Sequence, residues 1–384
     1  ILGGGSNIFL TGGARALVGG VPRGCRVPVG APSHKAIHNL IAEVEQVAHS
    51  GGVALSGIHK HSDTSVDSEY VSELGLVDSS TSNADMDDRA RNLVSGTPWL
   101  LSRPEHVGAF DLLVVDEAGQ MSLADAVAIG GCAGSIGLLG GQQQLPQVLQ
   151  GTHPEGADAS VLQHVIGDHD RIPPERGLFL GTTWRMHPEI CEFISERFYE
   201  GGLRSAEGCE PQRIDAPGAL SGAGLRMLEV EHSGRSQYAP EEAEAIAAAW
   251  AELLDGGTAT LREGGTRALE PSDILVVAPY NLAVREIASV VPAGVRVGTV
   301  DKFQGQEAPV GFYAMTSSSA ADAPRGLDFL FQSNRLNVAI SRAQCLAVLV
   351  CSPRLLDAEC RTLEQMRMVN HACRYGEMSS GGTI

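Results

Sequence analysis

The sequence predicts an α/β protein built from two tandem doubly wound domains, each with a parallel sheet. Short apolar segments alternate with amphipathic helical segments along most of the 384 residues, which is typical of parallel strands covered by helices on both faces. A chain of this length that is 43% hydrophobic can bury two cores of ordinary size. We therefore expect a first domain at residues 1–177 and a second domain at residues 178–384.

The first domain is expected to begin its ordered part with a strand at residues 26–31 and a helix after Ser33. Ser33 is a favourable N-cap, and apolar residues recur in the following segment with the i, i+3, i+4 and i+7 spacing of a buried helix face. Residues 58–92 are polar and without periodicity, so they predict an irregular insertion. Further strands are expected at residues 112–115 and 136–139, with a helix after Met121.

The second domain is expected to hold a sheet of its own. Pro188 is a preferred first-turn residue and opens a helix with one apolar face, and a second strong helix is predicted at residues 241–254. Strands are predicted at residues 178–180, 274–277, 295–300, 310–315 and 346–350, and a last helix is predicted to start at Pro353. Gly and Pro punctuate residues 151–177, which we interpret as the joint between the domains.

The composition narrows the class of protein. A net charge of −18 argues against a surface that coats nucleic acid throughout, but it leaves a local basic groove possible. No apolar run reaches the roughly 18 residues of a membrane-spanning helix and no signal peptide is present, so we expect a cytoplasmic protein. The eight cysteines lack C-x-x-C or zinc-type spacing and are expected to be reduced. Because the chain begins at Ile1, we expect further sequence upstream.

Two carboxylates, Asp116 and Glu117, directly follow the buried strand predicted at residues 112–115. Ligand-binding groups of α/β folds lie at the carboxyl ends of the strands. One carboxylate there can hold Mg²⁺ while the next orients or deprotonates an attacking water, as phosphoryl transfer requires. Acidic residues also end strands without any catalytic role, so the pair alone is compatible with both interpretations.

Three further segments carry candidate groups. The last strand of the first domain is followed by three amides ending at Gln144, which can either sense a phosphate or form a polar loop. Trp184 and Arg185 can stack on a purine base and reach a phosphate, although a core tryptophan beside a surface arginine is the commoner arrangement. Arg335 and Arg342 are seven residues apart, which places them on one side of a predicted helix, as arginine fingers or as solvated side chains.

The order and spacing of these segments resemble motifs II to VI of superfamily 1B helicases, in the up-frameshift and Nam7-like group. The five segments are DEAGQ at residues 116–120, GGQQQLP at 140–146, TTWRMHP at 182–188, TVDKFQGQE at 299–307 and NRLNVAISRA at 334–343. Residues 31–36 resemble motif Ia of the same group. The residues of these motifs most resemble the helicase half of bacterial proteins in which a RecB-like nuclease is fused ahead of the motor.

This resemblance covers nearly the whole chain and implies two RecA-like domains of the P-loop NTPase fold, with ATP and Mg²⁺ in the cleft between them. Asp116 is then expected to bind Mg²⁺, Glu117 to activate water and Gln144 to contact the γ-phosphate. Arg185 and Arg342 are expected to act as arginine fingers.

The resemblance also implies residues that bind the rest of the nucleotide and the nucleic acid. Nucleotide contacts are expected from Gly3 and Gly5 of the phosphate loop, Trp184 on adenine, and Gly305 and Glu307 beside the ribose and γ-phosphate. Contacts to the backbone of single-stranded nucleic acid are expected from Ser33, Thr97 and Thr299, with Lys35 and Lys302 beside them. Two of the three lysines in the chain therefore fall in these motifs.

The phosphate loop departs from the family pattern G-x-x-x-x-G-K-[ST]. In the matching window, residues 3–10, the second glycine is Ile8, the lysine is Phe9 and the hydroxyl residue is Leu10. The missing lysine neutralises phosphate charge and the missing hydroxyl completes the Mg²⁺ shell. Losing one such electrostatic donor typically costs about 10²- to 10³-fold in rate. Gly141 also stands where the family normally has Asp.

Two functions follow as hypotheses. The first is an ATP-driven helicase or translocase that walks 5′ to 3′ on single-stranded DNA, with RNA as the other possible strand and a RecB-like nuclease possibly upstream. The second is a module that binds nucleic acid or nucleotide without hydrolysis. An unrelated P-loop enzyme such as a kinase does not account for the arginine-bearing motifs of the second domain.

Overall fold

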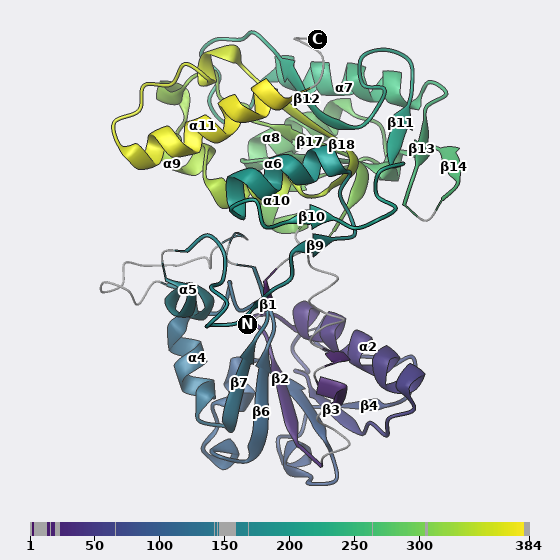
Figure 1. Ribbon diagram of the computed structural model, residues 1–384, viewed down its shortest axis with the longest axis vertical. Helices are drawn as coiled ribbons and strands as arrows, with labels where there is room; N and C mark the ends of the chain where they lie inside the picture. Colours follow the sequence, from purple (N-terminus) through teal and green to yellow (C-terminus); the bar gives the residue numbers. More distant parts are fainter. Residues whose placement is uncertain are drawn as a thin grey trace. The chain divides into compact units, whose positions relative to one another are not determined.

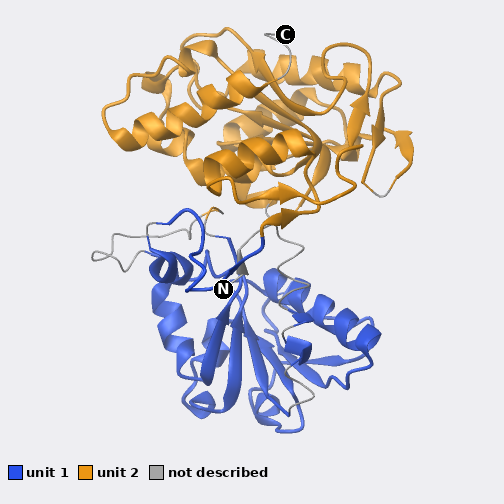
Figure 2. Ribbon diagram, in the orientation of Figure 1, with its two compact units in different colours: residues 1–142, 146–180 blue, residues 143–145, 181–384 orange. Residues whose placement is uncertain are grey.

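The computed structural model describes most of the chain. The described residues are 2–3, 14–15, 17–19, 24–65, 67–141, 143, 145, 159–167, 169–262, 264–303 and 306–379. The chain forms two compact units, residues 1–142 with 146–180 (unit 1) and residues 143–145 with 181–384 (unit 2), shown in Figure 2. Each unit holds a parallel sheet with helices on both faces, which confirms the predicted α/β class.

Unit 1 is built around a six-stranded sheet in which every strand pair is parallel, in the order β4-β3-β5-β2-β6-β7. The strands are β2 (Val27–Gly30), β3 (Gly57–Lys60), β4 (Val77–Ser80), β5 (Leu93–Gly96), β6 (Phe110–Val115) and β7 (Ala133–Leu138). The helices are α2 (His34–Gly51), α3 (Pro98–Leu101), α4 (Leu123–Gly130) and α5 (Val161–Ile166), with short 3₁₀ turns at Ala84–Asp87 and Pro104–His106.

Helices α2 and α4 lie on opposite faces of this sheet (Figure 1). On the α2 face, Ile37, Leu40 and Val44 pack with Val29 of β2, and the chain enters the helix through the expected N-cap, Ser33. The opposite face buries Ile129 of α4 together with residues of α3 and α5. Because both faces are covered, the central strands are apolar on both sides.

The prediction that residues 58–92 form an irregular insertion is wrong for two parts of that range. Strand β3 lies inside the sheet, between β4 and β5, and β4 forms its edge. Gly, His, Lys, Asp and Ser are depleted in strands, so these short segments carry no recognisable strand signal. The neighbouring strands impose the extended conformation, and a Cβ at Gly57 would lie only 2.6 Å from a Val77 methyl group.

Residues 178–180 were predicted to open the second domain, and this is also wrong. Strand β8 (Leu178–Phe179) pairs in parallel with β1 (Leu2–Gly3), and both belong to unit 1. Unit 2 resumes at Gly181. Helix α5, within the segment interpreted as a joint, likewise packs into the core of unit 1 through Val161, Leu162 and Ile166. A two-residue strand takes its place from its pairing partner, which local sequence does not specify.

Unit 2 contains a five-stranded parallel sheet in the order β12-β18-β17-β15-β16. Its strands are β12 (Gly224–Glu229), β15 (Ile274–Ala278), β16 (Arg296–Thr299), β17 (Ala308–Ala314) and β18 (Ala343–Cys351). Smaller pairings join β9 (Thr182–Thr183) to β10 (Arg204–Ser205). A three-stranded sheet has β13 (Thr258–Thr260) between β11 (Arg213–Asp215) and β14 (Thr266–Ala268).

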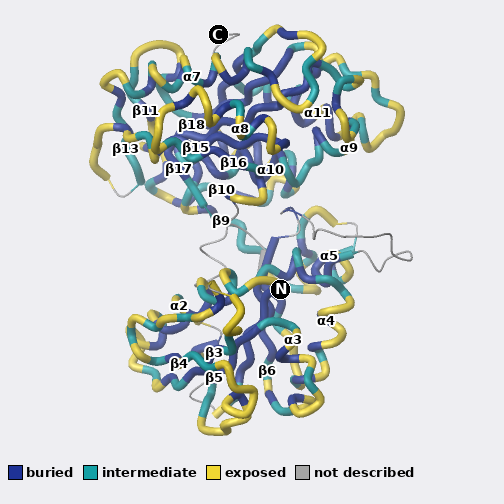
Figure 3. Tube along the Cα trace, turned by 180° about the vertical axis from the view of Figure 1, so that it is seen from behind, coloured by how far each residue is buried: buried dark blue, intermediate teal, exposed yellow. Residues whose placement is uncertain are grey.

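The helices of unit 2 form two layers on this sheet. They are α6 (Pro188–Phe198), α7 (Pro240–Leu254), α8 (Asn281–Val290), α9 (Gly326–Leu330), α10 (Ser333–Ile340) and α11 (Leu363–Met378). Short 3₁₀ turns lie at Pro271–Asp273, Val300–Phe303, Ala320–Asp322 and Pro353–Leu355. Alternate residues of β15 face opposite layers: Val277 packs with α6 and α9 to α11, and Val276 packs with α7 and α8. The buried sheet strands are dark blue in Figure 3.

The last helix starts later than predicted. Pro353 opens only the 3₁₀ turn, and α11 begins at Leu363 behind the N-cap Thr362. A proline fits the first turn of either helix type, so Pro353 could not distinguish them. All eight cysteines are free thiols, as expected. None of the helices in the described part of the chain has the length and apolarity needed to span a bilayer.

Candidate nucleotide and nucleic-acid sites

The carboxylates Asp116 and Glu117 lie at the carboxyl end of β6, between β2 and the edge strand β7 of the unit 1 sheet. Asp116 is only 6% exposed, and its backbone N–H donates to the Gly30 carbonyl at 2.9 Å. Burial, and then the charge of Glu117, raise the pKa of Asp116 above its usual range. A carboxylate held in this way favours a bound cation, and a pair of carboxylate oxygens suits Mg²⁺.

The loops after β6 and β7 pack backbone against backbone beside these carboxylates. Ala118 donates to the Leu139 carbonyl at 2.8 Å, and a Cβ placed on Gly119 would lie 2.6 Å from the Gly141 carbonyl oxygen. Gly140 has a φ of 151°, and a Cβ there would lie 2.9 Å from the Ala118 nitrogen. Glycine is therefore required at residues 119 and 140 for the two loops to meet.

Several predicted nucleotide contacts lie outside the described residues. These are Gly5, Gln144 and Gly305, together with residues 4–10 of the altered phosphate loop. Gly3 is described only through its backbone, as the partner of Phe179 in the β1–β8 pair.

In unit 2, three distant segments converge on Arg185. Its Nε donates to Glu307 Oε2 at 2.5 Å, across 122 residues of sequence, and its Nη1 donates to the Ser341 carbonyl at 3.1 Å. Gln344 Nε2 donates to the other Glu307 oxygen at 2.9 Å. The Arg185 side chain is only 10% exposed, whereas the Glu307 side chain is 35% exposed, so the guanidinium is held in position while the carboxylate remains partly open to solvent.

The arginines at 335 and 342 do not share one side of a helix, contrary to prediction. Helix α10 ends at Ile340, and Arg342 lies in the connection to β18, where it is buried. Its Nε donates to the Val338 carbonyl at 2.9 Å and its Nη1 donates to the Gln306 carbonyl at 3.2 Å. The spacing argument failed because the helix ends two residues before Arg342. Arg342 consequently lies next to residues 306 and 307 in space, although it belongs to a different sequence motif.

Trp184 is 51% exposed, which excludes the alternative of a core tryptophan. The guanidinium of Arg262 lies over its ring, 5.0 Å from the ring centroid. An exposed indole held by a cation–π contact offers a flat surface to a planar ligand. No sequence motif singles out Arg262.

Unit 1 also contains a cavity of about 260 Å³ that includes one of the predicted strand contacts, Thr97. Lys60, Trp99 and Arg103 line the same cavity, and Trp99 is 87% exposed. Such an exposed aromatic beside cationic side chains is typical of single-stranded nucleic-acid binding sites. These three residues were missed by the sequence analysis, although an aromatic directly after the Thr97-Pro98 helix start could have signalled one of them.

The other predicted strand contacts in unit 1 lie at the start of α2. Ser33 Oγ accepts a hydrogen bond from the Ala36 N–H at 3.3 Å, so its side chain already serves as the N-cap. Lys35 lies in the first turn of the same helix, and the next residue before it, His34, lines the cavity that contains Thr97.

Unit 2 contains a cavity of about 600 Å³ that includes the predicted contact Thr299. Tyr280 stacks on Phe329 at a centroid distance of 5.5 Å, and the guanidinium groups of Arg325 and Arg335 each lie 4.4 Å from the Phe329 centroid. All four side chains line the cavity. Lys302 is close by in sequence, where its ammonium donates to the Val297 carbonyl at 3.3 Å.

A family model described as an AAA domain (AAA_12) matches residues 157–354, which is more than half of the chain. The chain belongs to this family. The matched region contains the segments that hold Arg185, Glu307 and Arg342.

Individual relatives agree with this assignment. Probable helicase MAGATAMA 3 from Arabidopsis thaliana is 26% identical over 270 residues, which covers 65% of this chain and 31% of that protein. The DNA replication ATP-dependent helicase/nuclease JHS1 from the same plant is 26% identical, covering 68% of this chain and 20% of that protein. The chain therefore spans a third or less of these relatives, and their names support the resemblance to superfamily 1 helicases of the up-frameshift type.

A solved structure, an arterivirus nonstructural protein 10 helicase with DNA, aligns with a TM-score of 0.47 and 15% identity. The alignment covers 89% of this chain and 58% of that one.

Proposed function

We propose that this chain is the motor part of an ATP-dependent helicase or translocase that acts on single-stranded DNA. The observation that carries the proposal is the cluster of Arg185, Glu307 and Arg342, which brings together three segments in the order of the helicase motifs. Two guanidinium groups held in place by hydrogen bonds are a preorganised electrostatic arrangement for stabilising transferring phosphoryl groups.

The remaining nucleotide contacts are proposed from the resemblance, and the chemistry of the side chains is compatible with them. The buried Asp116 carboxylate fits the oxygen ligands that Mg²⁺ prefers, and bound Mg²⁺ would neutralise phosphate charge. Glu117 is the base that orients water, and its φ of 51° turns the chain sharply after β6. Trp184 offers its exposed ring to adenine, while Gln144 and the glycines at 3, 5 and 305 complete the proposed set.

Nucleic-acid binding is assigned to the two cavities, one within each unit. Each contains an aromatic side chain, at least one arginine and one of the predicted threonines, Thr97 or Thr299. Ser33 and the lysines at 35 and 302 extend these surfaces. The direction of travel, 5′ to 3′, and a RecB-like nuclease upstream of this chain are further parts of the proposal that rest on resemblance.

A module that binds without hydrolysis is the second candidate, and one observation favours it. Phe9 and Leu10 occupy the phosphate-loop positions of the catalytic lysine and hydroxyl residue. If hydrolysis is lost, the described arginine cluster and the two cavities still serve binding. The motor therefore predicts ATP turnover and the binding module predicts none, whereas both predict affinity for a nucleic-acid strand.

The first experiment measures ATP hydrolysis with and without a single-stranded DNA oligonucleotide. A motor shows turnover that the oligonucleotide stimulates, and Glu117→Gln lowers that turnover by at least about 10²-fold because the water-orienting carboxylate is gone. Glu359→Gln alters an exposed carboxylate in unit 2 and should leave turnover unchanged. Absent turnover with retained strand binding contradicts the motor and supports the binding module.

The second experiment measures affinity for the same oligonucleotide by fluorescence anisotropy. Base stacking on an aromatic side chain contributes about 1–3 kcal/mol, so Trp99→Ala should weaken binding by about 5- to 150-fold. Leu363→Ala removes an equally exposed apolar side chain, 76% exposed, and should have no effect. Equal affinity for single-stranded RNA would overturn the choice of DNA, and an unchanged affinity of Trp99→Ala would remove this cavity from the proposal.

A further inference from the structure

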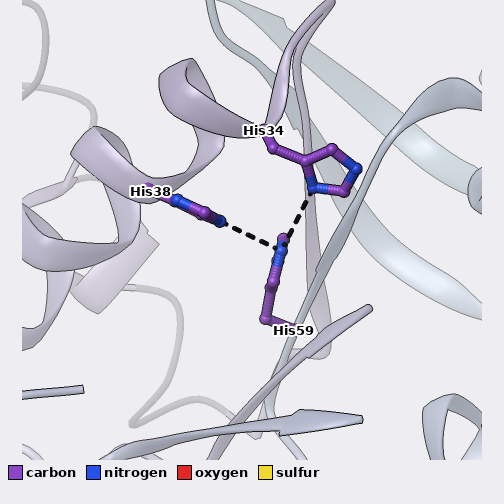
Figure 4. Close-up of side chains that lie close together, drawn as sticks. All are labelled: His34, His38 and His59. Carbon is purple, nitrogen blue, oxygen red and sulfur yellow. Dashed lines mark hydrogen bonds between the residues drawn. The ribbon is translucent and has the colours of Figure 1, made fainter. Parts of the chain in front are cut away.

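Three histidines from two elements of unit 1 point their ring nitrogens toward one another (Figure 4). His34 and His38 lie one turn apart at the start of α2, and His59 comes from β3 in the interior of the sheet. His59 Nε2 lies 3.4 Å from His34 Nδ1 and 3.3 Å from His38 Nε2. One nitrogen of each ring lies within 4.8 Å of the other two, and His59 is fully buried.

The two distances from His59 Nε2, 3.4 and 3.3 Å, match the edges of a metal coordination tetrahedron. Zinc–nitrogen bonds of about 2.0–2.1 Å place two ligands of a tetrahedral ion about 3.3 Å apart. The carbonyl oxygen of Ser68 completes the group, since it lies 3.0 Å from His59 Nε2 and 3.2 Å from His38 Nε2. We propose that His34, His38 and His59 bind a divalent transition-metal ion of the zinc type, with the Ser68 carbonyl as the fourth ligand.

Ser95 can orient His59 as a metal ligand. Ser95 Oγ donates to the Ile58 carbonyl at 3.3 Å and lies 3.0 Å from His59 Nδ1. In the tautomer with its hydrogen on Nδ1, His59 donates to Ser95 Oγ, and its Nε2 lone pair faces His34 Nδ1, His38 Nε2 and the Ser68 carbonyl oxygen. Ser95 is then the outer partner that orients the ligand.

The surroundings hold the rings and the loop in place. Tyr70 packs on the His38 ring with the centroids 5.4 Å apart, and its hydroxyl donates to buried Glu45 of α2 at 2.5 Å. The Ser68 hydroxyl is bonded within its own loop, donating to the Ser62 and Ser65 carbonyls at 2.9 and 2.7 Å. The Ser68 carbonyl is therefore fixed by a structured turn. Little conformational freedom is left to lose when an ion binds.

The chemistry of the three rings suits a transition-metal ion. Neutral imidazole is the form of histidine that coordinates metal. Imidazole selects zinc-type ions, whereas Mg²⁺ prefers carboxylates and water, so this site is chemically separate from Asp116 and Glu117.

A metal at this position joins α2 to β3 and to the Ser68 loop. His34 also lines the cavity that contains Thr97 and Trp99, together with Lys60, the last residue of β3, and His61. The proposed ion would therefore fix the wall of that cavity. This role is structural, and it does not depend on whether the chain hydrolyses ATP.

The test uses the full chain stripped of metal with a chelator and titrated with Zn²⁺ or Co²⁺. We expect one tight equivalent, and visible cobalt absorption of a four-coordinate site without a sulfur-to-metal band, because no cysteine takes part. His38→Gln and His59→Gln should each weaken affinity by more than the roughly 10- to 100-fold that loss of an outer-shell partner causes. Mg²⁺ in excess should not displace the ion.

His49→Ala is the matched control, since His49 is an exposed histidine on the same helix α2. It should keep the tight equivalent and the cobalt spectrum. His38 is only partly buried, so without metal His38→Gln should unfold at the same temperature as the wild type. Zn²⁺ should raise the unfolding temperature of the wild type but not that of His38→Gln. Zinc affinity unchanged in His38→Gln and His59→Gln, or the absence of a tight equivalent, would overturn the proposal.

Discussion

The imidazole of His371 shows how one buried residue makes stability depend on pH. It lies on α11 in contact with α6, where Arg197 Nε donates to His371 Nδ1 at 2.9 Å and the Phe198 ring is 5.0 Å away. Because Nδ1 accepts this hydrogen bond, the ring is neutral. Burial, and then the charge of Arg197, lower the pKa of His371 to about 4.

We predict that unit 2 loses stability as the pH falls from about 6.5 to about 4. The folded pKa lies below the unfolded value, so the unfolded chain takes up the proton first and the stability present above pH 6.5 is lost on acidification. The loss from this group is on the order of 2–3 kcal/mol. Urea unfolding at several pH values should show a weaker dependence in His371→Gln than in the wild type.

His169 provides the control for this prediction. It is an exposed histidine of unit 1, and His169→Gln should leave the pH dependence of unfolding as in the wild type. An identical pH profile for His371→Gln and the wild type would contradict the assignment of this effect to His371.

At the scale of secondary-structure elements, the contact between the β6 and β7 loops determines where the carboxylates lie. Gly119 leaves room for the Gly141 carbonyl oxygen, which would be 2.6 Å from an added Cβ. Because the obstructing atom belongs to the backbone, the loop itself has to move. Any such movement also displaces the adjacent Glu117.

We predict that Gly119→Ala lowers the free energy of unfolding of unit 1 by about 1–3 kcal/mol, the usual cost of overpacking. Gly131→Ala is the matched control. Gly131 follows α4 with a φ of −70°, and an added Cβ there would meet nothing within 4 Å, so stability should change by less than about 0.5 kcal/mol. Equal denaturation midpoints for the two variants would show that the close approach at Gly119 has no energetic weight.

At the scale of the whole molecule, charge is unevenly distributed along the chain. The chain has a net charge of −18, and its three lysines, Lys35, Lys60 and Lys302, all lie in or beside the segments proposed to bind nucleic acid. An acidic protein repels a polyanion except where such local positive charge is concentrated. Strand binding should therefore depend strongly on ionic strength.

We predict that the logarithm of single-stranded DNA affinity falls linearly with the logarithm of salt concentration, with a slope between about −2 and −4. Each neutralised phosphate contributes about −0.7, so Lys60→Ala should make the slope shallower by about that amount. Arg354→Ala alters an exposed arginine in the 3₁₀ turn before α11 and should leave the slope unchanged. Titrations between about 50 and 200 mM salt measure both slopes, and a slope near zero would contradict phosphate binding by these lysines.

The sequence by itself determined the α/β class and most of the regular elements. Long helices such as α2 and α7, and buried strands such as β15, carry their own periodicity or apolar runs, which depend on neighbouring residues only. The motif order also follows from the sequence alone. It selected Arg185, Glu307 and Arg342, which the structure then brings together.

Only the tertiary structure decided which distant residues meet. Strand β3 forms because its neighbours pair with it, and the same sheet order brings His59 to His34 and His38. Trp99 joined the candidate site because it lines one cavity with Lys60. Pairing across a sheet and packing between a strand and a helix depend on residues far apart in the chain, so no local pattern records them.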